Sequence, residues 1–221
     1  MTSNIKNLIF KGTSPYSGLE IEKYYDGSIE THINSRKGEI RPSLYHALSL
    51  VKNPKLLVEI GTYQGASAIF FAKELEQLGL DCEVACIDTF VGSITHWTND
   101  YFYKDLKLEY GFPTLYKQFL SNVITHGCQD KIIPLPLTSL DGARFLAHNN
   151  ISPDLIYIDA RHEYPDVLLD IVNYYQVLKA GGVIFGDDYD GWEGVRKSVD
   201  QFGRDSGITP KVINGKWFIN K

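Results

Sequence analysis

The chain has 221 residues, of which 43% are hydrophobic and 22% charged, proportions typical of a folded globular protein and not of a disordered or fibrous one. Its formal net charge of −5 argues against a binder of duplex nucleic acid, which needs clustered Lys and Arg to contact phosphates. No apolar run approaches the roughly 20 residues that span a bilayer, and no signal peptide is recognisable, so we expect a cytoplasmic protein with reduced, buried cysteines.

The first 50 residues differ in pattern from the rest of the chain. Turn-rich patches surround Gly12, Gly27 and Gly38, and a helix is predicted from about Pro42 to Val51. We expect this segment to form an N-terminal cap over the ligand-binding side of one larger domain, residues 51–221.

Between residues 56 and 187, short apolar runs alternate with helix-length amphipathic stretches, the pattern of βαβ units in a parallel sheet. Strands are predicted at 56–60, 84–88, 132–135, 155–159 and 183–187. Helices are predicted at 65–78, 114–125, from 139 onward, at 165–179 and at 193–202. The stretch 89–113 is rich in aromatic side chains and too long for an ordinary connection, so we interpret it as a lid.

The C-terminal tail carries two short strand-like runs, 211–213 and 216–219. Asn214 and Gly215 between them are a strong signal for a two-residue hairpin turn. The predicted fold class is therefore α/β, a doubly wound, Rossmann-like, mostly parallel sheet that ends in an antiparallel C-terminal hairpin.

A turn rich in glycine follows the first predicted strand, at the edge where doubly wound sheets bind ligands. Gly61 permits a tight turn, and Gly65 lets the next helix begin close to a ligand. Glu59 is placed to accept from a cationic amino group, and Asp88, which ends the second strand, to accept both hydroxyls of a ribose. Simple helix capping is the alternative, but the combination favours a nucleoside-type cofactor.

Tyr63 argues against a dinucleotide, because the nicotinamide fingerprint has glycine where a tyrosine would crowd the pyrophosphate. The ExGxxxG motif, the acid after the second strand and Gly181-Gly182 before the fifth resemble class I S-adenosylmethionine-dependent methyltransferases over roughly residues 56–220. The resemblance implies S-adenosylmethionine as cofactor, its methionine part near Glu59 and the Gly61–Gly65 turn and its ribose at Asp88.

The same resemblance places Thr138 and Ser139 near the adenine. Phe90 is a candidate to pack on the base, with a core or lid role as the alternative. The remaining residues of the predicted cofactor site are Thr62, Tyr63, Ser67, Thr89 and Asp159.

Three aspartates follow two neighbouring strands, Asp159 after the fourth and Asp187 with Asp188 after the fifth. They would repel one another unless a cation lies between them, and oxygen ligands suit Mg²⁺, with Mn²⁺ or Ca²⁺ as alternatives. Capping of the following helices is the other interpretation. His162, three residues after Asp159, is placed to transfer a proton at the same site.

The DxxH motif followed 28 residues later by Asp-Asp resembles the metal-dependent O-methyltransferases of macrolide sugars, of the macrocin and mycinamicin type, and their broader family. By that likeness Asp159, Asp187 and Asp188 hold magnesium, and His162 with Asp159 forms the catalytic pair. Aminocoumarin-sugar relatives carry an aspartate where this chain has Arg161, so their base is not carried over.

We therefore expect an O-methyltransferase that acts on a hydroxyl of a sugar or glycosylated small molecule, without nucleic-acid or membrane partners. Two other functions fit the same scaffold: a hydroxylase-like or phenol-modifying enzyme, and a non-catalytic cofactor-binding module. The sequence leaves open the acceptor and whether the chain forms a homo-oligomer.

Overall fold

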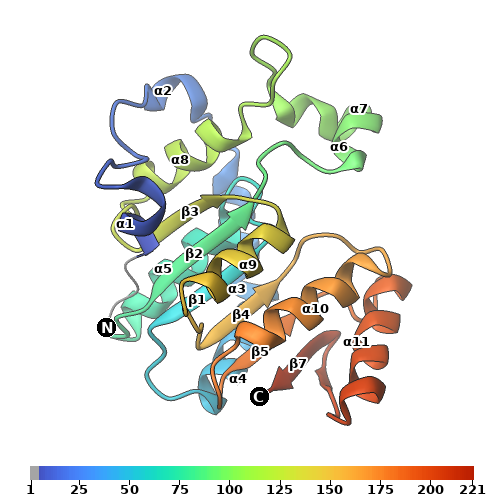
Figure 1. Cartoon of the computed structure of the whole chain (residues 1–221). Helices are drawn as coiled ribbons and strands as arrows, with labels where there is room; N and C mark the ends of the chain where they lie inside the picture. Colours follow the sequence, from blue (N-terminus) through green and yellow to red (C-terminus); the bar gives the residue numbers. More distant parts are fainter. Residues whose placement is uncertain (1–4) are drawn as a thin grey trace.

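The computed structural model describes residues 5–221, which contain one seven-stranded sheet in the order β3-β2-β1-β4-β5-β7-β6 (Figure 1). The strands are β1 Leu56–Ile60, β2 Glu83–Asp88, β3 Ile132–Pro136, β4 Leu155–Ile158, β5 Val183–Gly186, β6 Lys211–Ile213 and β7 Lys216–Asn220. All neighbours from β3 to β5 pair in parallel, whereas β7 pairs antiparallel with both β5 and β6. The predicted fold class is confirmed, and the order reverses beside β1, between β1 and β4.

Helices cover both faces of the sheet, and alternate residues of each strand feed two separate cores. One face carries α3 Ile29–Glu39, α4 Arg41–Leu50, α5 Ala66–Gln77 and α8 Leu115–Thr125. The other carries α1 Ile5–Phe10, α9 Ser139–His148, α10 Asp166–Val177 and α11 Glu193–Ser206. The parallel strands β1 to β5 are therefore almost entirely buried and apolar, as expected for parallel pairing, whereas the edge strand β6 is largely exposed. No helix within residues 5–221 is long and apolar enough to cross a bilayer.

The N-terminal segment is more helical than predicted. The turn expected around Gly38 lies instead in the last turn of α3, where Ile29 and Ile33 are buried against the core. This expectation was wrong because burial of an apolar face outweighs the low helix propensity of one glycine. Gly12 and Gly27 do lie in turns with positive φ, and α4 matches the predicted helix.

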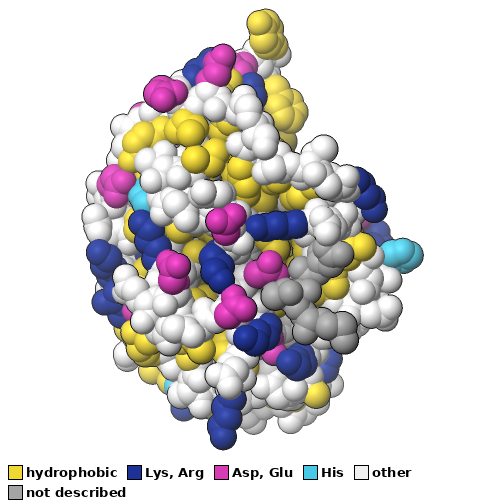
Figure 2. Space-filling view, turned by 90° about the vertical axis from the view of Figure 1, so that its left-hand side faces the viewer, with side chains coloured by type: hydrophobic (Ala, Val, Ile, Leu, Met, Phe, Trp, Pro, Cys, Tyr) yellow, Lys and Arg dark blue, Asp and Glu magenta, His cyan; other side chains and the backbone are white. Residues whose placement is uncertain are grey.

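The segment 89–113 contains the short helices α6 Ile94–Thr98 and α7 Asp100–Tyr103, a 3₁₀ turn at Lys104–Leu106, and no long helix or strand. Leu106 is buried, and Glu109 pairs with Lys23 of α2 (Ile21–Tyr24) at 2.7 Å and with Lys117 of α8 at 2.6 Å. Several aromatic side chains of this segment are exposed. Figure 1 places the segment at the top of the molecule, and Figure 2 shows hydrophobic surface gathered there. Its action as a lid stays a prediction.

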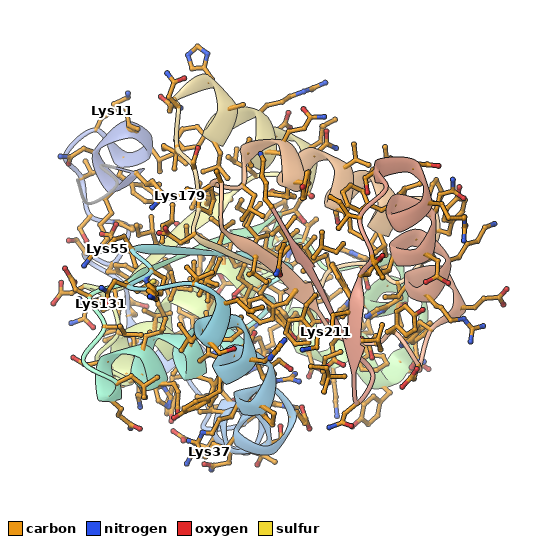
Figure 3. The ribbon with its side chains drawn as sticks, turned by 90° about the horizontal axis from the view of Figure 1, so that it is seen from below. Lys11, Lys37, Lys55, Lys131, Lys179 and Lys211 are labelled. Carbon is orange, nitrogen blue, oxygen red and sulfur yellow. The ribbon has the colours of Figure 1, made fainter. Side chains whose placement is uncertain are left out.

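The opposite edge of the sheet, where the parallel strands begin, is held by paired charges. Figure 3 looks onto this edge and labels Lys55, Lys131 and Lys179, which precede β1, β3 and β5. The buried carboxylate of Asp154 accepts the Lys55 backbone N–H at 2.8 Å and the Lys179 ammonium at 2.7 Å. These bonds align the starts of neighbouring strands and leave the carboxyl edge for a ligand site.

Candidate active site

The turn between β1 and α5 is shaped by the close approach of β4. Gly61 has a φ of +85°, and a Cβ added there would lie 2.3 Å from the backbone oxygen of Asp159. Gly65, at +90°, faces the ring of Phe119, which would lie 2.9 Å from an added Cβ. Both positions therefore need glycine. For Gly65, packing against Phe119 is a second reason besides the closeness to a ligand that was expected from the sequence. The turn and the end of β4 form one continuous surface.

Glu59 is fully buried beneath this turn. Its carboxyl accepts hydrogen bonds from the hydroxyls of Thr62, at 2.6 Å, and Ser67. Burial raises the pKa of Glu59 to about 7, although these two hydrogen bonds oppose the rise. The carboxyl is enclosed and positions the turn from below, and its contact with a cofactor stays a prediction.

Asp88 ends β2 at the rim of the same turn. Its two oxygens accept the backbone N–H groups of Tyr63, at 2.9 Å, and Phe90, at 2.7 Å. Each carboxylate oxygen can accept a second bond, so Asp88 keeps the capacity to bind two hydroxyls of a ribose. Thr89, next to it, is exposed.

The other predicted cofactor residues already make contacts within the protein. The Phe90 ring is 2% exposed and packs against Tyr116, in agreement with the core role given as the alternative, and its contact with the base stays a prediction. Thr138 caps α9 by accepting the N–H of Asp141 at 3.1 Å, and Ser139 donates to Asp170. Contact of Thr138 and Ser139 with adenine stays a prediction.

His162 lies between two carboxylates at the ends of β4 and β5. Its Nε2 is 2.9 Å from Asp188 and 3.9 Å from Asp159, and its ring stacks on Trp192 at 4.7 Å. The carboxylates of Asp159 and Asp188 raise the pKa of His162 to about 10. The structure thus brings together the predicted base and two of the three predicted metal ligands.

Asp187 is held apart from this group. It forms an ion pair with Lys216 at the start of β7 and accepts the N–H of Asp188 at 2.6 Å. The predicted trio of carboxylates is therefore divided, because one cationic side chain satisfies Asp187 and another satisfies Asp159 and Asp188. The sequence analysis did not identify Lys216 as a site residue. Antiparallel pairing of the C-terminal hairpin with β5, had it been considered, would have placed Lys216 beside Asp187.

The remaining group fits a divalent cation. Ligand atoms of Asp159, His162 and Asp188 all lie within 4.8 Å of one another, and all three side chains are half-buried. Two carboxylates and one imidazole form a mixed set of oxygen and nitrogen donors, which Mn²⁺ and other transition metals accept more readily than Mg²⁺. The structure thus groups His162 with Asp159 and Asp188, whereas magnesium binding by Asp159, Asp187 and Asp188 stays a prediction.

The sequence interpretation also missed Arg36, which α3 delivers to this edge. Its guanidinium is partly buried and pairs with Glu39 at 2.7 Å. Burial acts to lower the pKa of Arg36, but the opposing influence of Asp159, Tyr157 and Glu39 is stronger and raises it. The N-terminal segment therefore adds positive charge near the end of β4.

Comparison with known proteins identifies one family model, described as a methyltransferase domain, which matches residues 58–189, more than half of the chain. Among solved structures, CalS11, calicheamicin methyltransferase, is 17% identical over 92% of this chain and 97% of its own, with a TM-score of 0.56. A second structure of CalS11, without ligand, names it a TDP-rhamnose 3'-O-methyltransferase. The O-methyltransferase NovP is also 17% identical, over 91% of this chain and 78% of its own, with a TM-score of 0.57.

MycE, a methyltransferase from the mycinamycin biosynthetic pathway in complex with Mg, SAH and mycinamycin VI, is 13% identical. The match covers 87% of this chain and 53% of MycE, with a TM-score of 0.52. Identities this low show a shared fold alone. No curated protein matches the sequence.

Proposed function

The chain belongs to the methyltransferase-domain family, and from that premise we propose that it is an S-adenosylmethionine-dependent O-methyltransferase acting on a sugar or glycosylated small molecule. The observation that carries this proposal is the contact between the two halves of the site. Gly61, in the predicted cofactor turn, packs directly on Asp159, which belongs with His162 to the acid–base group. A methyl donor and a proton acceptor would thus lie side by side.

For the cofactor, the proposal assigns the ribose to Asp88 and the methionine part to the surface formed by residues 61–65. Free lone pairs on both Asp88 oxygens support this assignment, since its present partners are two backbone N–H groups. The SAH found with the fold relative MycE is consistent with a nucleoside cofactor on such a sheet.

For the reaction, bound S-adenosylmethionine would supply the methyl group, its carbon–sulfur bond breaking as the bond to the acceptor oxygen forms, and S-adenosylhomocysteine would be released. Asp159 and Asp188 orient the ring of His162; a divalent cation on these carboxylates would compensate the charges that raise the pKa of His162, and the neutral imidazole would then take the hydroxyl proton. A divalent cation held by Asp159 and Asp188 would supply positive charge that lowers the pKa of the acceptor hydroxyl. Trp192, stacked on His162 and half exposed, offers a flat surface to a sugar ring.

The test is to measure S-adenosylmethionine binding by calorimetry and methyl transfer from the labelled donor to a panel of sugars, glycosides and phenols. We expect a product heavier by one methylene and activity that EDTA removes and a divalent cation restores. A product heavier by one oxygen would favour a hydroxylase, and binding without turnover on every acceptor would favour a non-catalytic module. Full activity in EDTA would refute the metal.

A further inference from the structure

A groove separates the junction of α3 and α4 from the C-terminal hairpin. Glu39, Ser43 and His46 line one wall, and Ile213, Lys216 and Phe218 line the other. It contains about 570 Å³ of space, part of which is open solvent. The N-terminal and C-terminal parts of the chain therefore build one concave surface together.

The groove adjoins the candidate active site through β7. Lys216 lines the groove and pairs with Asp187. Trp217 points to the opposite face of the sheet, where its indole N–H donates to the Asp187 carbonyl at 3.0 Å, so within residues 5–221 the groove meets the site through Lys216 and Asp187 alone. A molecule in the groove would thus have one end beside Asp187, the residue next to Asp188.

Two buried polar atoms on the α4 wall lack partners within the described residues. Ser43 is 3% exposed, and its hydroxyl makes no hydrogen bond there. The Nε2 atom of His46 is likewise buried and unpartnered, while the His46 ring packs edge-on against Phe218 at 4.6 Å. A buried polar atom without a partner is unfavourable, and both residues line the groove, so a hydroxylated ligand there is positioned to supply these partners.

Both charged side chains of the groove already form ion pairs with residues that do not line it. Glu39 pairs with Arg36 at 2.7 Å, and Lys216 with Asp187. Because both charges are compensated, the groove gives no advantage to an anionic ligand. Its apolar surface comes from Phe218 and Ile213, so the groove favours a neutral ring with one apolar face and several hydroxyls.

We propose that this groove binds the methyl acceptor as a neutral, hydroxylated ring such as an aryl glycoside. Ser43 and His46 hydrogen-bond to hydroxyls that are not methylated and thereby determine which hydroxyl reaches His162. The assignment rests on the proposed O-methyltransferase function and extends it to the substrate class and to two specificity residues.

The experiment measures binding of 4-nitrophenyl β-D-glucopyranoside to the full chain by saturation-transfer NMR, with S-adenosylhomocysteine present. Ser43→Phe fills the groove, and Ser49→Phe, the same change on an exposed position of the same helix, is the matched control. His46→Leu removes the ring nitrogen without filling the groove and serves if Ser43→Phe fails to fold. Calorimetry with S-adenosylhomocysteine accompanies each variant.

We expect Ser43→Phe and His46→Leu to lose at least about fivefold in glycoside signal, while Ser49→Phe and the affinity for S-adenosylhomocysteine stay at the wild-type level. Equal glycoside binding by wild type and both groove variants would overturn the groove assignment alone. So would a wild type that binds a thymidine diphosphate sugar but not the neutral glycoside. A wild type that binds no S-adenosylhomocysteine would refute the proposed function and, with it, this inference.

Discussion

Replacing Gly61 by alanine tests whether the site depends on the close approach of β1 and β4. At a φ of +85°, the new Cβ would lie 2.3 Å from the Asp159 carbonyl oxygen and 2.5 Å from the Ala160 Cα. Left-handed backbone costs alanine roughly 1–2 kcal/mol. Overlap with backbone atoms, which cannot rotate away, adds roughly 1–3 kcal/mol as the two strand ends separate.

Gly79 provides the matched control, because it has a φ of +70° and no atom of the described chain lies within 4 Å of an added Cβ. Gly79→Ala therefore pays the backbone cost alone, and urea unfolding should show Gly61→Ala to be the less stable variant by roughly 1–3 kcal/mol. In a chain of this size that difference lowers the melting temperature by a further ~2–12 °C. Calorimetry should also show weaker S-adenosylhomocysteine binding by Gly61→Ala. Equal unfolding midpoints for the two variants would refute the reasoning.

Three further predictions concern the buried and catalytic groups. The folded-state pKa of Glu59, about 7 against an ordinary 4.5, means that the folded state binds the proton more tightly, so wild-type stability should fall as pH rises from about 4.5 to 7. The urea midpoint of Glu59→Gln should not show this fall with pH. If the midpoints of wild type and variant depended on pH in the same way, the assignment of the fall to Glu59 would be contradicted. Asp88→Ala should weaken S-adenosylhomocysteine binding in calorimetry at least about tenfold, since hydrogen bonds to a charged group contribute about 1.5–3 kcal/mol each; an unchanged Kd would move the ribose elsewhere. His162→Ala should lower kcat by roughly 10²- to 10⁴-fold with cofactor affinity retained, and an unchanged rate would leave His162 a structural residue.

The strands could be predicted because burial on both faces imposes an unmistakable local pattern. Every predicted strand lies within a residue or two of its observed limits, and the Asn214-Gly215 turn has positive φ at both positions. Parallel strands bring their carboxyl ends to one edge, so Asp88 and Asp159 could be assigned to that edge before any distance was known.

Local patterns were less informative where packing decided the conformation. The last turn of α3 accommodates Gly38 because Ile29 and Ile33 are buried, and Phe90 packs in the core, where its place beside Asp88 had left both a core role and a ligand contact open. In both cases a tertiary contact decides what the neighbouring residues alone do not.

The order of elements, the fold class and the acids at the strand ends were contained in the sequence, because each depends on residues close together in the chain. The partners of those acids were not. Lys216 meets Asp187 only because β7 pairs with β5, and Arg36 reaches the end of β4 only because α3 packs beside α5. Charge pairing depends on distances of a few ångströms between segments far apart in sequence, so the tertiary structure alone decided how the three aspartates share their cations.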